Sequence, residues 1–516
     1  MKNIHKYLLL LILPFCVSTS CTKLDEKVYS SISADNFFRS ESEVMLNVGR
    51  IYVQLRQINN RWGAGSMSLV TSGECIIPFR ETNLWWDNGT WIDLYSHKFD
   101  YQNPAIVGGW DFCFNGITSC NQVLYQLENT PVEFASKESI KSEVKVIRAF
   151  YLLTALDWFG NIPITTDFKD ISLPIQSTRK QVFDFIEKEL KDNVSLLAPY
   201  TTSENYGRAS QACAYTMLTK LYINSQEWTG IAKWSEAIAS ANSVIGMNHY
   251  NLPADYFSNF KVLNSGSTEN IFVIPYDKIN TDGWDDGLIL HHLSLHSLSS
   301  ETFGFSAFCW DGYAATEDLY NSYEATDNRI NSWLVGPQFS LSGEPLMLSP
   351  GRQLNYRPHV TSLYNSANPS LLDDGVRIKK YEYEKDLTDP QSMSNDWVIF
   401  RYADVLLLKA EAIMRQNGGL ANSEAIDLVN QVRTRAYGNT EHNYTTSSLT
   451  LDELLAERGR ELAWEGGIRR QDVIRFGKWQ NAWFEKPAEA DGHTKLFPIP
   501  LQVLDVNPNL KPNPGY

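Results

Sequence analysis

Residues 140–158, IKSEVKVIRAFYLLTALDW, carry the pattern that decides the fold. Apolar or aromatic residues recur in this stretch every three or four positions, at Ile140, Val144, Ile147, Tyr151, Ala155 and Trp158. This spacing places them on one face of an α-helix. The stretch therefore predicts a helix over residues 137–158 that buries one face against a neighbour.

The same spacing recurs along the chain, which predicts a mainly α-helical protein. Apolar stripes indicate further helices at residues 35–56, 108–128, 208–224, 231–245, 402–416 and 422–436. Two capping boxes, Thr178 with Gln181 and Thr450 with Glu453, predict the starts of two more helices, the first of them spanning residues 179–198.

Taken in order, the predicted helices form four antiparallel pairs. The pairs are 35–56 with 108–128, 137–158 with 179–198, 208–224 with 231–245, and 402–416 with 422–436. A single pair buries little apolar surface, so pairs of this kind must stack on one another. The arrangement resembles tetratricopeptide repeats, although loops interrupt the strict 34-residue spacing. We expect a curved helical scaffold.

Two stretches, residues 59–107 and 246–399, break the helical pattern. Both are irregular and rich in Gly and Asn, with only short strand-like runs such as residues 271–276. Loops of this length in a compact protein are usually functional or disordered. Their aromatic content argues against disorder. We therefore expect them to fold onto the scaffold and to form its working face.

The first 21 residues have the layout of a secretory signal peptide. Lys2 and Lys6 precede an apolar run at residues 7–17, and three small residues then lead into Cys21. The run is too short for a membrane-spanning helix, which needs about 20 residues. A cysteine at this point is where a bacterial lipoprotein is cut and acylated, although Ser18 stands where an aliphatic residue is usual. We expect removal of residues 1–20 and lipidation of Cys21; ordinary secretion with an unmodified Cys21 is the alternative.

Composition excludes some classes of partner. The net charge of −15 does not suit binding to nucleic acid or to anionic lipid. No second long apolar run follows the leader, so we expect membrane contact only through the lipidated end. The cysteines beyond Cys21 are odd in number, which argues against a complete disulfide framework; they are Cys75, Cys113, Cys120, Cys213 and Cys309.

Aromatic side chains cluster in the irregular stretches and supply the candidate binding residues. An indole offers a flat surface to the C–H face of a sugar, while Arg and Asn can bind its hydroxyls. The first cluster is Arg80, Trp85, Trp86, Asn88 and Trp91. Neighbours in an extended segment point in opposite directions, so at most one of the two adjacent tryptophans should face a ligand. Packing of both beneath the loop is the alternative.

A second cluster, Trp284, Trp310 and Tyr313, lies in the second irregular stretch. Each of these residues alone is more often part of a core than a ligand contact. As a set, we expect at least one of them to join the site.

Metal and catalytic patterns are weak. Asp282, Asp285 and Asp286 could hold hydroxyls or calcium but fail the calcium-loop pattern, so we expect no metal and keep structural calcium as a minor alternative. His291, His292 and His296 lack ligand spacing and read as structural. A charged run predicts a solvated or ion-paired helix face rather than a catalytic one; it comprises Glu457, Arg458, Arg460, Glu461, Arg469, Arg470 and Asp472.

Five ordered blocks resemble the SusD/RagB family of surface lipoproteins. They are EVKVIRAFYLLTALDWFGNIPIT (143–165), RYADVLLLKAEAIMR (401–415), VNQVRTRA (429–436), ERGRELAWEGGIRRQDVIRFGKW (457–479) and LFPIPLQVLDVNPNLKPNPGY (496–516). Residues 466–469, GGIR, depart from the family, which more often has an aromatic pair after the glycine. We interpret this departure as a change in packing.

The resemblance implies one unit over residues 21–516. Its parts would be a scaffold of four tetratricopeptide-like helix pairs at 35–58, 108–245 and 400–436, ligand-face regions at 59–107 and 246–399, and a C-terminal family region at 437–516. Related proteins bind sugar with residues of the first of these ligand-face regions, 59–107, which favours the first cluster, from Arg80 to Trp91.

The resemblance also implies a function without catalysis and without a cofactor. Such a protein is lipid-anchored on the cell surface at the outer membrane. It captures oligo- or polysaccharide and acts as a hinged lid over a SusC-like TonB-dependent transporter. A RagB-like, peptide-binding uptake protein is one alternative. A glycoside hydrolase, working through two carboxylates about 5–10 Å apart, is a more distant one.

Overall fold

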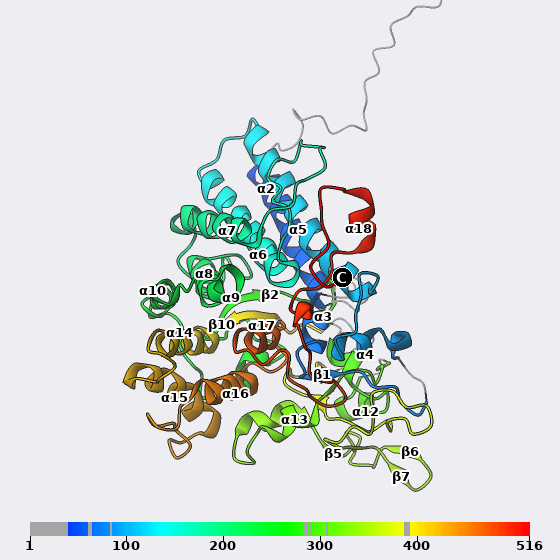
Figure 1. The fold of residues 1–516 in the computed structure, drawn as a ribbon. Helices are drawn as coiled ribbons and strands as arrows, with labels where there is room; N and C mark the ends of the chain where they lie inside the picture. Colours follow the sequence, from blue (N-terminus) through cyan, green and yellow to red (C-terminus); the bar gives the residue numbers. More distant parts are fainter. Residues whose placement is uncertain are drawn as a thin grey trace, which may run out of the picture.

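The computed structural model describes residues 40–59, 64–82, 85–281, 287–288, 290–305, 308–385 and 393–516. Within these ranges the protein is mainly α-helical, as the sequence predicts (Figure 1). The helices are α2 (Glu41–Val53), α3 (Ala64–Val70), α4 (Thr90–Tyr95), α5 (Pro104–Asn129), α6 (Lys137–Phe159), α7 (Arg179–Asn193), α8 (Gln211–Ile223), α9 (Ser225–Thr229), α10 (Trp234–Ile245), α11 (Leu290–Ser294), α12 (Ser299–Phe303), α13 (Glu317–Asn321), α14 (Tyr402–Gln416), α15 (Ser423–Tyr437), α16 (Leu451–Glu461), α17 (Ile468–Arg475) and α18 (Leu501–Val506).

Local sequence explains where several helices begin. Thr178 and Gln181 form the predicted reciprocal capping box at the start of α7. Thr450 caps α16 by accepting from the backbone N–H of Glu453 at 3.1 Å. The Glu453 carboxylate accepts from the Tyr444 hydroxyl instead of returning to the cap, so the predicted second box is only half formed. Helix α5 begins at Pro104, earlier than expected, because Asn103 caps it and proline suits the first helical position.

The predicted helix pairs are present. Helix α2 packs on α5, α6 on α7, α8 on α10, and α14 on α15. Neighbouring pairs are joined because α5 also packs along α6, and α10 along α14. Gly116 on α5 permits the close approach of α6, since a Cβ atom there would collide with the ring of Tyr151. The pairs follow one another from α2 to α15 along one side of the molecule (Figure 1).

Short antiparallel strand pairs hold the irregular stretches against the scaffold. Strand β2 (Asn270–Ile274) pairs with β10 (Trp397–Arg401), and both strands are buried along their length. Strand β1 (Cys75–Ile76) pairs with β3 (Ala314–Ala315) and so links the two irregular stretches. The remaining strands are β4 (Trp333–Leu334) with β9 (Arg377–Ile378), β5 (Gly336–Pro337) with β8 (Asn355–Tyr356), and β6 (Met347–Ser349) with β7 (Arg352–Gln353).

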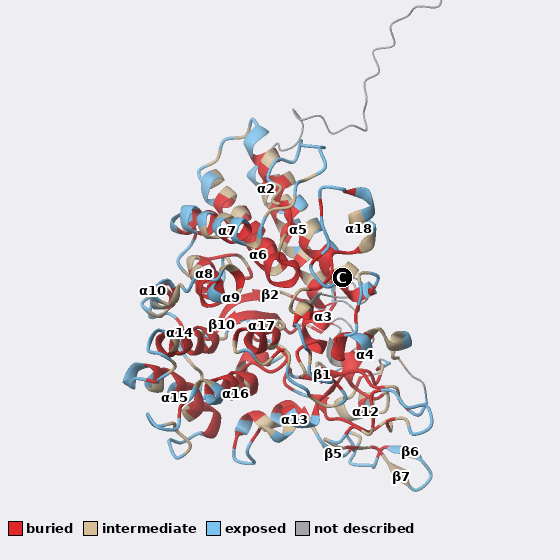
Figure 2. Cartoon of the chain, in the orientation of Figure 1, coloured by how far each residue is buried: buried red, intermediate tan, exposed pale blue. Residues whose placement is uncertain are grey.

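Buried residues concentrate along α5, α6, α8 and α14 and around the β2–β10 pair, as Figure 2 shows. The five cysteines from Cys75 to Cys309 are buried and carry free thiols, in keeping with the argument against a disulfide framework. No helix in the described ranges has both the length and the apolar character needed to cross a membrane.

Apart from the half-buried Arg469, the charged run of α16 and α17 lies inside the protein. Arg401 is 1% exposed, and its guanidinium binds the carboxylates of Glu269, Glu461 and Glu465 at 2.5–2.7 Å. Burial alone would raise the pKa of Glu457, but the adjacent arginines, led by Arg329, lower it to about 2. The ion-paired alternative is therefore confirmed, and the solvated alternative is wrong.

A second set of buried ion pairs joins α17 to the scaffold. Arg458 binds Asp404 of α14 at 2.9 Å and Asp472 of α17 at 2.8 Å. Arg475 binds Glu411 of α14 at 2.7 Å and Asp472 at 2.6 Å. Charges removed from water are tolerated only when paired in this way, so these contacts fix α16 and α17 against α14.

Candidate functional site

Backbone hydrogen bonds bring the two irregular stretches together at one place. The N–H of Phe79 donates to the carbonyl of Leu363 at 2.8 Å, and the N–H of Ser370 donates back to Phe79 at 3.1 Å. The N–H of Glu81 donates to Ser370 at 2.8 Å. These bonds place the segment that follows residue 80 beside Tyr364, which is almost 300 positions away in the chain.

A groove of about 460 Å³ opens at this junction. Three separate segments build it: the turn before α4 together with α4 itself, residues 363–364, and residue 485. Its walls are Trp86, Asn88, Gly89, Ile92, Asp93, Ser96, Lys98, Leu363, Tyr364 and Glu485.

An aromatic pair forms the flat part of the groove. Trp86 stacks on Tyr364 with ring centroids 5.4 Å apart and planes 14° from parallel. Phe79 meets both rings edge-on, at 5.0 and 5.3 Å. Tyr364 is 55% exposed, so the pair combines a fixed orientation with access to solvent. A stacked, oriented aromatic surface of this kind suits the C–H face of a pyranose ring.

The turn before α4 has an unusual backbone that fixes the direction of its side chains. Asp87, Asn88 and Gly89 have φ angles of 46°, 53° and 89°, all in the left-handed region. The Asp87 carboxylate accepts hydrogen bonds from the indole N–H groups of Trp85 at 2.5 Å and Trp91 at 2.8 Å. These bonds hold the turn from the inside, and Asn88 is exposed at its tip. Strained turns held by their surroundings are frequent at binding sites.

Trp85 and Trp86 pack against different neighbours, and only Trp86 lines the groove, although the backbone at Trp86 begins a turn and is not extended. Trp85 packs edge-on against Trp91 at 5.8 Å, Trp310 at 6.1 Å and Tyr313 at 5.2 Å. Trp91 and Tyr313 are fully buried. This aromatic cluster lies beneath the turn and supports it, whereas Trp86 lines the groove.

Arg80 is a structural anchor between the irregular stretches. Its guanidinium is 2% exposed and donates to the backbone carbonyls of Asp311 at 2.8 Å, Leu371 at 2.8 Å and Asp374 at 2.9 Å. Burial lowers the pKa of Arg80 to about 10. Because Arg80 is in the interior, it supports the groove from beneath, as Trp91 and Tyr313 do, and it does not line the groove surface.

The other predicted residues lie apart from the groove walls or outside the described ranges. Trp310 is half-buried beside Phe308, which is 62% exposed, with ring centroids 6.2 Å apart. Trp284 and the neighbouring Asp282, Asp285 and Asp286 lie outside the described residues, as does Cys21. Within the described part of the chain, no group of three or more His, Cys, Asp or Glu side chains could hold a metal ion. His292 is buried, with its ring 5.4 Å from that of Phe305.

Apart from Asn88, the polar groups of the groove were not identified from the sequence. Asp93, Lys98 and Glu485 are exposed and belong to its walls, and partial burial raises the pKa of Asp93. They offer both hydrogen-bond donors and acceptors next to the aromatic pair, which matches the needs of sugar hydroxyls. Tyr364 and Glu485 have no distinguishing sequence context, because only the fold brings them to Trp86.

Two families match this chain and together cover nearly all of it. Residues 222–516 match the SusD family, and residues 24–223 match a family described as "Starch-binding associating with outer membrane". The starch-binding protein SusD of Bacteroides thetaiotaomicron is 25% identical over 419 residues, which cover 73% of this chain and 72% of that protein. The SusD-like protein P25 of Formosa agariphila is 24% identical over 538 residues, which cover 99% and 97% of the two chains.

Solved structures share the fold. A laminarin-binding SusD-like protein superimposes with a TM-score of 0.75 at 21% identity, covering 93% of this chain and 100% of that one. Surface glycan-binding protein A from Bacteroides thetaiotaomicron, in complex with laminarihexaose, gives a TM-score of 0.73 at 21% identity, covering 92% and 99%. The family match extends over more than half of the sequence and agrees with the architecture, so this chain belongs to the SusD family.

Proposed function

We propose that this chain captures an oligo- or polysaccharide in the groove beside Trp86 and Tyr364. The observation that carries the proposal is the stacked, solvent-accessible aromatic pair next to Asn88, Asp93, Lys98 and Glu485. The matched relatives support it, because one is named a starch-binding protein and another was solved with laminarihexaose. These names describe binding proteins, so we also propose that the chain is not an enzyme.

Binding at this groove would divide between two kinds of contact. The C–H face of a sugar would lie on the aromatic pair, while its hydroxyls would exchange hydrogen bonds with the polar walls. An open groove desolvates few ligand atoms, so a single site should bind weakly. Tethering at the membrane beside an uptake protein raises the effective concentration of captured glycan and makes weak binding sufficient.

We further propose that Cys21 is lipidated and holds the protein on the outer surface of the outer membrane. The second matched family is described as associating with the outer membrane, which supports this location. Substitution of Cys21 by alanine should release the protein from the membrane fraction, as immunoblotting of fractionated cells would measure. A Cys21→Ala variant that remains with the membrane would contradict lipid anchoring at this residue.

A SusC-like TonB-dependent transporter is the proposed recipient of the glycan. The loop between α6 and α7 offers a surface for such a partner, because its apolar side chains point outward: Phe168 is 37% exposed, Leu173 50%, Ile175 75% and Ile171 98%. Hydrogen bonds from the C-terminal segment hold this loop in place. The side-chain amide of Asn507 donates to the carbonyl of Pro174 at 2.9 Å, and that of Asn509 donates to the carbonyl of Leu173 at 3.0 Å. Contiguous exposed apolar side chains mark sites of protein contact.

Affinity electrophoresis of residues 22–516 through gels containing different polysaccharides tests the binding proposal. We expect at least one glycan to retard the wild type, and Trp86→Ala to weaken that retardation strongly. Phe168→Ala is the matched control, because it removes an exposed aromatic ring outside the groove and should leave retardation unchanged. Retention of a peptide library instead would favour the RagB-like function. Steady release of new reducing ends would indicate a glycoside hydrolase.

A further inference from the structure

A second, larger groove lies on the opposite side of the molecule from the Trp86 groove. Its volume is about 860 Å³, nearly twice that of the Trp86 groove. One wall is helix α15, and the other is formed by residues 250–254 and Tyr402 at the start of α14. Figure 1 places α15 and α4 at opposite edges of the fold.

The α15 wall presents a row of uncharged polar groups with a single carboxylate. Asp427, Asn430, Gln431 and Thr434 are spaced by three or four positions and share one face of the helix. Asp427 and Gln431 are exposed, and the other two are half-buried. Exposed helix faces carry charged or polar residues, and this one carries mainly amides and a hydroxyl, which can both donate and accept hydrogen bonds.

Hydrogen bonds make this groove rigid before any ligand arrives. The Asn430 side chain donates to the carbonyl of Tyr444 at 2.9 Å and accepts from its N–H at 2.8 Å. The Thr434 hydroxyl donates to the Asn443 side-chain oxygen at 3.1 Å. These bonds fix the segment after α15 as part of the wall, and a preformed wall lowers the entropic cost of binding.

The facing wall supplies an aromatic ring, and α15 itself contributes a buried arginine. Tyr402 is half-buried and packs near-parallel to Tyr250, with ring centroids 6.4 Å apart and planes 26° from parallel. Arg435 is 8% exposed and commits its two terminal nitrogens to Glu269 and Glu461. Arg435 is therefore already paired in the interior and offers no free charge to a ligand in this groove.

We propose that this groove is a second binding site for neutral carbohydrate. Its amides, hydroxyls and one tyrosine ring match a polyhydroxylated chain without charge. An anion would meet Asp427 and find the Arg435 charge already neutralised by two carboxylates. The volume falls within the roughly 300–1,000 Å³ range of small-molecule sites and would hold a short oligosaccharide.

The inference extends the proposed function and rests on it. With grooves at both edges of the fold, one long polysaccharide could occupy both sites on a single chain or bridge two neighbouring chains. Linked binding of this kind raises overall retention well beyond that of either site without new contacts. Long polysaccharide should therefore be retained more strongly than its short oligosaccharide fragments.

Affinity electrophoresis with a polysaccharide that retards the wild type tests the second site. The background is the Trp86→Ala/Tyr364→Ala variant, in which the first groove is disabled. We expect this variant to keep measurable, weaker retardation. Addition of Asp427→Ala and Gln431→Ala, both at exposed positions, should remove what remains. Asp184→Ala/Lys188→Ala on α7, an exposed pair at the same spacing, is the matched control and should change nothing.

Each outcome decides between the two claims. Residual retardation that survives the Asp427→Ala/Gln431→Ala change would overturn the second site. A first-groove variant with no residual retardation would overturn it too, while it would support the Trp86 groove as the binding site. A wild type that no glycan retards would overturn both the proposed function and this inference. Loss of residual retardation in Tyr402→Phe, which removes only a hydroxyl, would add support for direct contact at this groove.

Discussion

Two regions of the molecule, helices α14–α17 and the segment around α4, use their charged and aromatic residues in opposite ways. Around α14–α17, charged side chains that read as a solvated or ion-paired face lie in the interior and bind one another, with Arg401 and Glu461 almost inaccessible to solvent. Around α4, the aromatic side chains that would be expected in a core reach the surface at Trp86 and Tyr364. Residue type alone therefore does not decide which side chains serve stability and which face a ligand.

The two regions differ in the partners that their side chains need. A buried charge is stable only when an opposite charge and hydrogen bonds replace water, and the α14–α17 region supplies them from several helices. A surface indole needs no such partner and is retained where a ligand can cover it. Substitutions in the charged region should thus change stability, and substitutions at the exposed rings should change binding.

The largest expected effect is that of Arg401→Met. The change leaves Glu269, Glu461 and Glu465 without their shared cation in the interior. Removal of one partner from a buried ion pair costs about 3–5 kcal/mol, so the free energy of unfolding measured with urea should fall by at least this amount. Lys188→Met, which breaks the exposed pair with Asp192, is the control and should cost less than about 1 kcal/mol. Equal effects of the two changes would contradict a structural role for the buried network.

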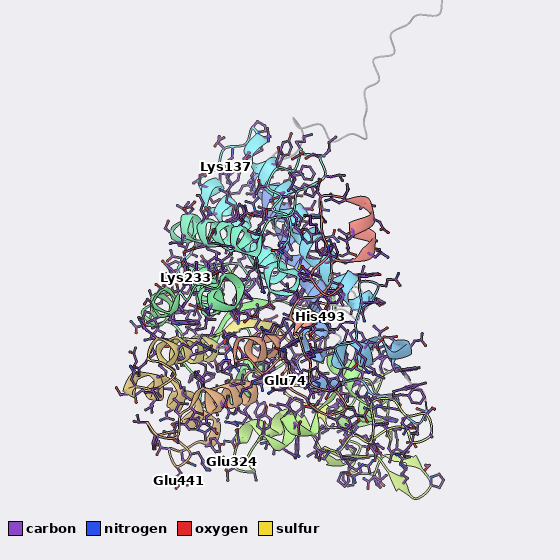
Figure 3. All side chains as sticks on the ribbon, in the orientation of Figure 1. Glu74, Lys137, Lys233, Glu324, Glu441 and His493 are labelled. Atoms are coloured by element: carbon purple, nitrogen blue, oxygen red, sulfur yellow. The ribbon has the colours of Figure 1, made fainter. Side chains whose placement is uncertain are left out.

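A smaller effect, which depends on pH, is expected for Glu74→Gln. Glu74 is buried near the centre of the molecule (Figure 3), and burial raises its pKa from 4.5 to about 7. Between pH 4.5 and 7 the folded state keeps a proton that the unfolded state releases, so the wild type loses stability as pH rises through this window. A glutamine at this position does not titrate, so the Glu74→Gln variant does not lose stability in this way as pH rises.

Glu74→Gln should therefore match the wild type at pH 4 and be more stable at pH 8, by up to about 3 kcal/mol. Urea unfolding of both proteins at the two pH values measures the difference. A variant that is less stable than the wild type at pH 8 would show that Glu74 is ionised and paired with Arg469, whose Nε lies 3.8 Å away.

Asp87→Ala should have a modest effect on stability and a clear effect on binding. The change removes the acceptor for the indole N–H groups of Trp85 and Trp91 and releases a turn with three left-handed residues. We expect a loss of about 1–2 kcal/mol in unfolding free energy, together with weaker glycan retention although Trp86 is intact. Full retention in this variant would show that the turn does not orient Trp86.

The helical scaffold could be predicted from the sequence because helix periodicity is a local signal. The stripe from Ile140 to Trp158 became α6, and Thr178 marked the start of α7. The early start of α5 at Pro104 also had a local signal, the adjacent Asn103 and Pro104, which the apolar stripe beginning further along did not include.

The site was less predictable because its parts come from distant segments. Trp86 and Asn88 could be chosen from the sequence, as could the expectation that only one of the two adjacent tryptophans lines the groove. The roles of Arg80, Trp91 and Tyr313 in supporting the turn depend on burial that only the folded chain decides. Tyr364 reaches Trp86 through the backbone bonds between residues 79–81 and 363–370, for which the sequence offers no periodic signal.

Isothermal titration calorimetry of Tyr364→Ala with a glycan that binds the wild type tests the division of roles most directly. Tyr364 is more than half exposed, so its loss should leave the thermal unfolding midpoint nearly unchanged. Because it forms half of the aromatic pair, its loss should raise Kd by about tenfold or more, which corresponds to at least about 1.4 kcal/mol of binding energy. An unchanged Kd, with the protein folded, would contradict the assignment of the Trp86 groove as the glycan-binding site.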